Sequence, residues 1–154
     1  MRLHASLEPL AFLLGTWRGE GEGVYPGVDP FRYREELTFT HVGDAFLLVT
    51  ESSWTPDGHP LHFERGTLRP VSEGRVDLTL AHPIGVAEVA EGTLDGRAIT
   101  TRSTAIARTA TGSPVVEIER RYRLDDRTLA YELDMATDGV ARTFHVRARL
   151  ERVG

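Results

Sequence analysis

The chain has no cysteine, lysine, asparagine or glutamine among its 154 residues. Without cysteine it forms no disulfide, offers no thiolate nucleophile and holds no cysteine-based zinc or iron–sulfur site. Without lysine it cannot form a Schiff base with a carbonyl substrate, and all 18 basic residues are arginines. These absences remove several enzyme classes before any motif is considered.

Long apolar runs are missing as well. No stretch approaches the ~18 apolar residues that suggest a membrane span, and the apolar run at residues 10–14 is too short for the core of a signal peptide. The net charge is −5 and no basic run is longer than Arg120-Arg121, which argues against binding of nucleic acid by phosphate neutralisation. We therefore expect a cytoplasmic protein that binds neither nucleic acid nor membranes.

One helical pattern opens the chain and strand patterns fill the rest. The helix is expected over residues 6–14, with Ser6 as its N-cap, Pro9 in its first turn and Gly15 after its last apolar residue. Beyond it, apolar and polar residues alternate in short pieces that are separated by turn residues. About ten strands are expected, at residues 17–25, 31–40, 45–54, 61–69, 75–81, 85–94, 98–107, 115–124, 128–136 and 141–152.

This pattern predicts an all-β protein, an antiparallel up-and-down β-barrel with one short N-terminal helix. Closure into a barrel is favoured because an open sheet of so many short strands would leave long unpaired edges. A barrel of more than eight strands leaves interior room for a ligand. No linker or internal repeat divides the chain, so we expect a single domain over residues 1–154.

The motif Gly-x-Trp-x-Gly-x-Gly opens the first expected strand with Gly15, Trp17, Gly19 and Gly21. Neither glycine nor tryptophan has acid–base chemistry, so we interpret the motif as architectural. Trp17 is expected to plug the closed end of the barrel, and the glycines to permit the bend that closing a sheet needs.

The order and spacing of several motifs resemble the nitrobindins, heme-binding barrels of the lipocalin and fatty-acid-binding superfamily. The resemblance covers nearly the whole chain. It implies heme b as cofactor, NO and peroxynitrite as small-molecule ligands, and isomerisation of peroxynitrite to nitrate as the activity. Besides the glycine–tryptophan motif, the matching segments are residues 25–26, 31–36, 41–43, 60–69, 86–92, 118–121, 129–136 and 145–152.

The resemblance also implies the site residues. His145 falls where nitrobindins place the axial ligand to heme iron, and it is therefore the expected catalytic residue. His62 and Met135 match positions that line the heme pocket, while His82 stands where the family usually has glutamine. Whether this second imidazole coordinates iron or donates a hydrogen bond stays open. Solvated or structural positions are expected for the remaining histidines, His4, His41 and His59.

Strand alternation conflicts with this role of His145. In the last expected strand Val146, Ala148 and Leu150 share one face, and His145 lies on the other face with Arg147. Alternation alone therefore points the imidazole into solvent. Two ways to reconcile the roles stay open: a cavity face that is the more polar one, or a β-bulge that redirects the side chain.

The chain also departs from the nitrobindin pattern near the heme. Gly27 follows Tyr-Pro where the family often has threonine, and Ser113-Pro114 stand where it often has lysine. Heme affinity or propionate anchoring is therefore expected to differ, with Arg32 or Arg108 as candidate substitutes. At the closed end, Arg147 or Arg149 is a candidate to stack on Trp17, as an arginine does in lipocalins; a surface position is the alternative.

Two other functions remain open at this point. The first is a carrier of a fatty acid or other apolar ligand without heme, in which an arginine inside the barrel would clamp a carboxylate. The second is a barrel that has lost its ligand. Glu35 and Glu36 point to opposite strand faces and so cannot act as one catalytic dyad. The oligomeric state also stays open.

Overall fold

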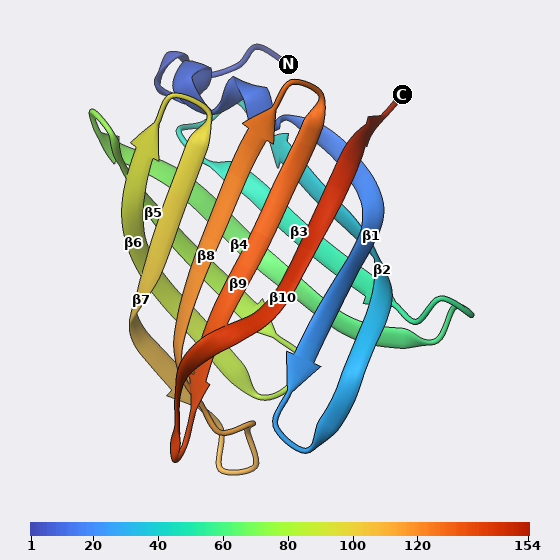
Figure 1. The fold of residues 1–154 in the computed structure, drawn as a ribbon. Helices are drawn as coiled ribbons and strands as arrows, with labels where there is room; N and C mark the ends of the chain where they lie inside the picture. Colours follow the sequence, from blue (N-terminus) through green and yellow to red (C-terminus); the bar gives the residue numbers. More distant parts are fainter.

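The computed structural model describes residues 1–154 and folds them into one short helix, η1 (Ala5–Leu13), and ten strands. Each strand pairs antiparallel with its neighbours along the chain, and β1 closes the ring against β10 (Figure 1). The strands are β1 (Gly15–Tyr25), β2 (Val28–His41), β3 (Leu47–Trp54), β4 (Pro60–Ser72), β5 (Arg75–His82), β6 (Val86–Asp95), β7 (Ala98–Arg108), β8 (Val115–Asp125), β9 (Thr128–Thr137) and β10 (Val140–Val153).

The expected antiparallel barrel of ten strands is confirmed. The alternation of apolar and polar residues has its usual cause, because inward side chains fill the barrel and outward ones face water. In β3 the burial alternates without interruption between buried and half-buried positions. Turn chemistry sets the hairpins: Asp95-Gly96 joins β6 to β7, and Gly96 takes the positive φ of 59° that such a tight turn needs.

The helix is a 3₁₀ helix over Ala5–Leu13, one residue earlier than the expected span. Leu7, Leu10 and Leu13 are all fully buried. Their spacing of three residues matches the three residues per turn of a 3₁₀ helix, so all three lie on one face and cover the end of the barrel. No helix of this protein has both the length and the hydropathy needed to cross a membrane.

The N-cap of η1 is His4, and the expectation of Ser6 was wrong. The Nδ1 atom of His4 accepts a hydrogen bond from the backbone N–H of Ser6 at 3.2 Å. An imidazole nitrogen thus satisfies a backbone donor of the first turn, the task that a serine hydroxyl performs at most N-caps. His4 is exposed, as expected for a residue of the N-terminal segment.

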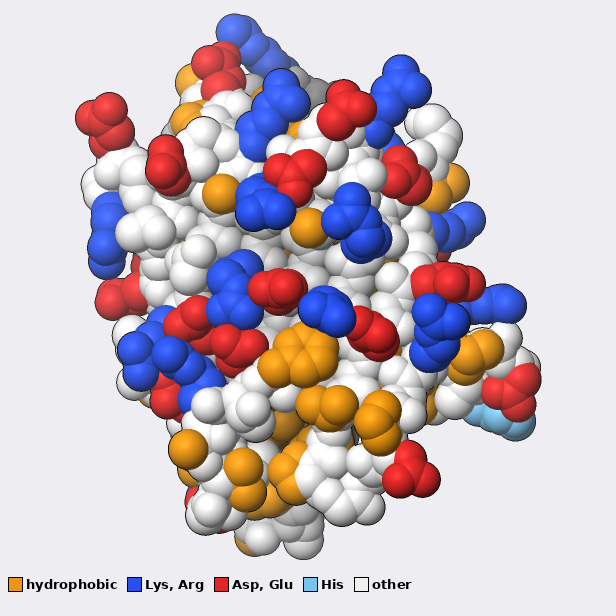
Figure 2. All heavy atoms as spheres, viewed as in Figure 1, with side chains coloured by type: hydrophobic (Ala, Val, Ile, Leu, Met, Phe, Trp, Pro, Cys, Tyr) orange, Lys and Arg blue, Asp and Glu red, His pale blue; other side chains and the backbone are white.

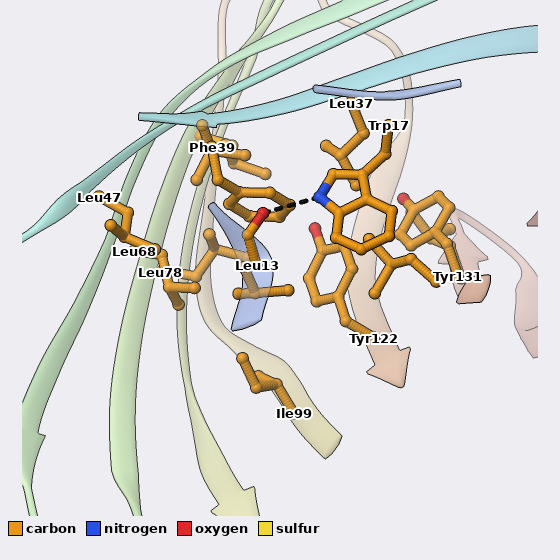
Figure 3. Packing of buried hydrophobic residues seen from close by; sticks show 14 of the residues in the cluster. Leu13, Trp17, Leu37, Phe39, Leu47, Leu68, Leu78, Ile99, Tyr122 and Tyr131 are labelled. Carbon is orange, nitrogen blue, oxygen red and sulfur yellow. Dashed lines mark hydrogen bonds between the residues drawn. The ribbon is translucent and has the colours of Figure 1, made fainter. Parts of the chain in front are cut away.

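Trp17 plugs the end of the barrel under η1, as the sequence predicts. Its side chain is 1% exposed, and its Nε1 donates a hydrogen bond to the carbonyl of Leu13 at 2.7 Å (Figure 3). This bond ties the helix to β1 and satisfies the indole N–H inside the core. The arginine that stacks on the ring is Arg152, at 4.5 Å from the ring centroid, rather than Arg147 or Arg149.

The pairing of β1 with β10 explains why Arg152 is the arginine that stacks on Trp17. Trp17 lies directly opposite Arg152 in the pairing of β1 with β10, so Arg152 is the arginine within reach of the indole. Arg147 instead forms an outer ion pair with Glu22, with 2.6 Å between Nε and Oε1. The sequence alone does not give the offset between the first and last strands. For this reason Arg147 and Arg149, rather than Arg152, were expected to stack on Trp17.

The glycines of the motif serve close packing. A Cβ atom at Gly19 would collide with the carbonyl oxygen of Arg149, and one at Gly21 would collide with the ring of Tyr33. Any side chain here would push β1 away from its neighbours. The architectural interpretation of the motif therefore fits the structure.

Replacing Trp17 by alanine should lower the free energy of unfolding by roughly 3–5 kcal/mol, because it empties a large core site and removes the bond to Leu13. Urea unfolding followed by circular dichroism measures the change. Trp54→Ala is the control, since Trp54 is only half-buried at the end of β3 and should cost less. A loss below about 1 kcal/mol for Trp17→Ala would contradict the plug.

Candidate functional site

A cavity of about 590 Å³ opens at the end of the barrel opposite η1, among the lower turns in Figure 1. Its volume lies in the range of ligand pockets, and more than half of its lining residues are hydrophobic. Three of these residues are both lining and exposed: Val28 is 55% exposed, Leu61 46% and Ile84 38%. Hydrophobic side chains also gather toward this lower end in Figure 2, below a charged middle zone.

A β-bulge in β10 turns His145 into this cavity. Phe144 pairs with Asp134 of β9 while Val146 pairs with Leu133, the next residue back, so His145 is an extra residue without a partner. The insertion shifts the alternation, and His145 and Val146 both line the cavity. Of the two ways to reconcile the strand pattern with a pocket-facing histidine, the bulge is the one that the structure contains.

The surroundings of His145 keep its imidazole neutral and oriented. Its Nδ1 lies 2.6 Å from the carbonyl oxygen of Val24, which requires the proton to sit on Nδ1. The ring of Tyr25 packs edge-on at 5.8 Å between centroids. Burial lowers the pKa of His145 below 6.5, although the bond to Val24 opposes this effect. The Nε2 atom therefore presents a lone pair, the form in which histidine binds a metal.

Beside the cavity, inside the barrel, lies a buried ionic network centred on Arg120, which is 1% exposed. Its guanidinium donates to both oxygens of Glu64 at 2.7 and 2.8 Å, to Glu88 at 2.8 Å and to the hydroxyl of Tyr131 at 2.8 Å. The charge of Arg120 holds the pKa of Glu64 and of Glu88 below 4.5 against the opposing effect of burial. Both carboxylates are therefore ionised inside the barrel.

This network is not among the features predicted from the sequence. Its signal is positional: Arg120 stands between Ile118 and Tyr122, two inward-facing apolar residues, so strand alternation already points Arg120 inward. Charged residues are almost never fully buried unless they are paired, and the partners lie on distant strands. Pairing could not be recognised before the strands were arranged around the barrel.

Two further acids, Glu35 and Glu51, are buried beside the network and line the cavity. Burial is the main cause that raises the pKa of Glu35 to about 8 and the pKa of Glu51 to about 10. For Glu51, the neighbouring charge of Glu64 adds to this effect. Both are therefore protonated at neutral pH. Glu36 points outward to Arg18, at 2.5 Å, which confirms that Glu35 and Glu36 occupy opposite faces of β2.

His82 connects the cavity to the network. Its Nε2 lies 3.1 Å from Glu88 and its Nδ1 lies 3.2 Å from Glu64. Burial alone would lower the pKa of His82, but these two carboxylates raise it to about 9. His82 is thus an imidazolium ion at neutral pH, although the nearby charge of Arg120 opposes this.

These buried groups predict that the fold loses stability as the pH rises. Glu35, Glu51 and His82 hold protons in the folded state up to about pH 8, 10 and 9, whereas the unfolded chain releases them near 4.5 for the acids and 6.5 for histidine. The folded state therefore binds more protons, and the free energy of unfolding should fall by about 2 kcal/mol or more from about pH 6 to pH 9.

Chemical denaturation in a chelator-containing buffer at several pH values checks this slope. Glu51→Gln cannot titrate and should flatten the decline, while Glu36→Gln on the outer face should keep it. A free energy of unfolding that is constant or rising over this interval would contradict the protonated state of the buried acids.

The comparison with known proteins decides the family. Residues 6–152 match the family described as "THAP4-like, heme-binding beta-barrel domain". The chain belongs to this heme-binding nitrobindin family. The resemblance found in the sequence is thereby confirmed, and heme is the cofactor that the family binds.

Full-length relatives agree with this family. "Peroxynitrite isomerase 2" of Mycobacterium marinum is 43% identical over 155 residues, which cover 97% of this chain and 96% of the relative. "Peroxynitrite isomerase" of Nocardia farcinica is 41% identical, with 97% of this chain and 92% of the relative covered. The crystal structure of Rv2717c from M. tuberculosis superposes with a TM-score of 0.92 at 38% identity, covering 99% of this chain and 100% of that one.

The side chains that the nitrobindin resemblance implied lie around one cavity. His62, Met135 and His145 all line it, and so does His82. The other histidines lie elsewhere: His41 accepts a hydrogen bond from the backbone N–H of Gly43, and His59 is in an exposed turn. These four side chains come from two pairs of adjacent strands, β4 with β5 and β9 with β10.

The two departures from the nitrobindin pattern are placed differently. Ser113 lines the cavity, whereas Gly27 takes a positive φ of 79° in the turn between β1 and β2 and is not among the lining residues. Of the two arginines that are candidates to anchor a heme propionate, Arg32 lines the cavity with an exposed side chain. Arg108 is engaged by Asp138 at 2.9 Å. Arg32 is therefore the better placed of the two.

These residues fit a heme. The cavity is mainly apolar, and His145 offers a neutral imidazole with its outer nitrogen already hydrogen-bonded. A backbone carbonyl on Nδ1 is the usual second contact of a metal-binding histidine, because it fixes the ring and its tautomer. An exposed arginine at the cavity completes the match with an anionic propionate edge.

Proposed function

We propose that this protein binds ferric heme b in the cavity through Nε2 of His145, binds NO, and isomerises peroxynitrite to nitrate. The observation that carries the proposal is the bulge at His145, which brings a neutral imidazole with a bonded Nδ1 into an apolar cavity. Membership of a heme-binding family and the names of its relatives support the same function.

When bound, heme supplies an iron at which peroxynitrite rearranges to nitrate, a conversion within one molecule that needs no reductant. The chain contributes the environment. Val24 holds the imidazole of His145 in the tautomer that keeps Nε2 unprotonated. The hydrophobic lining, including Met135 and Val146, would shield a bound heme from water.

We assign two supporting roles to other cavity residues. His62 is the half-buried polar side chain facing the cavity, and we propose that it contacts the small ligand rather than the iron. Arg32 is proposed as the partner of a heme propionate, in place of the lysine that is missing near Ser113. A guanidinium serves this purpose through charge and paired N–H donors.

The alternative of a fatty-acid carrier finds no support at the interior arginine. That function needs a guanidinium free to clamp a carboxylate, and Arg120 is the fully buried arginine of the barrel. Its donors are already used by Glu64, Glu88 and Tyr131. A fatty acid would have to displace these carboxylates.

Peroxynitrite decay, followed by stopped-flow absorbance and by nitrate and nitrite analysis, tests the function. The heme-loaded protein should speed the decay and shift the product toward nitrate, and the heme-free protein should do neither. Free hemin at the same concentration is the control for chemistry without the cavity. Equal decay rates for the loaded and heme-free protein would refute the proposed activity.

A further inference from the structure

Three side chains on the floor of the cavity converge on one point. The Nε2 atom of His62 lies 3.1 Å from Oε1 of Glu64 and 3.2 Å from Nδ1 of His82, and the last two atoms are 3.2 Å apart. The atoms form a nearly equilateral triangle. His62 and Glu64 stand two residues apart on one face of β4, and the pairing of Arg65 with Ala81 sets His82 of β5 opposite Glu64.

Hydrogen bonds alone serve this triangle poorly. A proton on Nδ1 of His82 can point to Glu64 or to His62, but it cannot satisfy both contacts with good geometry. A metal ion accepts a lone pair from each of the three atoms at once. Zinc–ligand distances of about 2.0–2.1 Å at tetrahedral angles place neighbouring ligand atoms ~3.3 Å apart, close to the sides of this triangle.

The outer atoms of the three residues are held as in metal sites. The far nitrogen of His82, Nε2, lies 3.1 Å from Oε1 of Glu88, the carboxylate–histidine contact that orients a ligating imidazole. Glu64 is fixed by two hydrogen bonds from Arg120. Glu88 and Arg120 therefore stand behind the triangle as supports of its ligands.

An independent observation is a pair of buried carboxyl groups with unpartnered oxygens in the same cavity. Oε1 of Glu35 and Oε2 of Glu51 are buried without a hydrogen-bond partner in the protein, and both residues line the same cavity. Glu35 is 3% exposed and Glu51 7%. In the metal-free protein Arg120 and the protonated His82 balance Glu64 and Glu88, while Glu35 and Glu51 keep their protons. A divalent cation at the triangle would replace the proton of His82 and would place a stronger positive charge close to these two unpartnered acids.

We propose that His62, Glu64 and His82 form a binding site for a divalent first-row transition ion, foremost Zn²⁺, on the floor of the cavity. Two imidazoles and one carboxylate are a ligand set of catalytic zinc sites, which keep a fourth position open for water or substrate. Here that position faces the cavity. The site does not use the axial residue His145, and the proposal does not depend on heme binding. With a metal on Nε2 of His62, only the Nδ1 atom of that ring is left for a contact with the small ligand.

Metal titration of the purified full chain tests the site. After removal of metals with a chelator, the protein is titrated with Zn²⁺ in a calorimeter, and with Co²⁺ to record the visible absorption of a four-coordinate ion. The parent should bind one Zn²⁺ per chain with a dissociation constant below ~1 µM. His82→Gln should weaken binding by at least ~100-fold, since it removes a ligand and keeps a polar side chain.

Three variants make the result decisive. His62→Gln, at a half-buried position, should weaken binding like His82→Gln, and a thermal unfolding curve verifies that each variant is folded. His59→Gln, in an exposed turn, should bind as the parent does. The proposal is overturned if the parent binds no Zn²⁺ in this range, if both ligand variants bind normally, or if His145→Ala abolishes binding instead.

Discussion

Replacing His145 by alanine is expected to weaken hemin binding by at least ~100-fold while the barrel stays folded. The imidazole is the group in the cavity that combines a free lone pair with a fixed orientation, because burial keeps it neutral and Val24 holds Nδ1. Its removal leaves the apolar cavity, so weak hydrophobic uptake of hemin should persist. Titration followed in the Soret band gives the affinity and the change of the spectrum.

The fold should tolerate this change because His145 is the extra residue of a bulge and has no partner on β9. His59→Ala, which removes an exposed histidine, is the matched control and should bind hemin as the parent does. If His145→Ala bound hemin as tightly as the parent with an unchanged spectrum, the axial assignment would be wrong. His62 and His82 would then be the next candidates, since both line the cavity.

Replacing Arg120 by methionine is expected to lower the free energy of unfolding by about 3–5 kcal/mol. The reason is that Glu64 and Glu88 would remain buried without their counter-ion, and each would have to lose a charge or take up water. Tyr131 would also lose the donor to its hydroxyl oxygen. Urea unfolding at neutral pH in the presence of a chelator measures the effect.

The next residue in the chain supplies the control. Arg121 faces outward and pairs with Glu119, Glu132 and Asp134 at 2.6 to 3.1 Å, but its side chain is 33% exposed. Arg121→Met should cost less than about 1 kcal/mol, since surface ion pairs contribute little. Equal losses for the two variants would show that burial does not set the strength of the Arg120 network.

Much of the architecture could be predicted from local patterns. Alternation and turn residues such as Asp95-Gly96 locate each strand to within a few residues, and the burial of Trp17 follows from its motif. The capping residues indicate only that a helix is present and do not identify its type. The signal for a 3₁₀ helix is the spacing of Leu7, Leu10 and Leu13 at intervals of three, which places all three on one face.

The site could be predicted only in part. The resemblance brought His62, Met135 and His145 forward, and the structure places all three around one cavity. The direction of His145 depends on a bulge, which shows only when two strands are paired. The ionic network depends on contacts between β4, β6 and β8. Alternation within β8 points Arg120 inward, but its carboxylate partners Glu64 and Glu88 lie on other strands and could not be assigned to it from the sequence.

The most direct test of the heme assignment is anomalous diffraction at the iron absorption edge from crystals soaked with hemin. The account predicts a single iron peak in the cavity, at bonding distance from Nε2 of His145, with Nδ1 still hydrogen-bonded to the carbonyl of Val24. A peak on His62 or His82, or no iron in the cavity of a crystal that has taken up hemin, would contradict it.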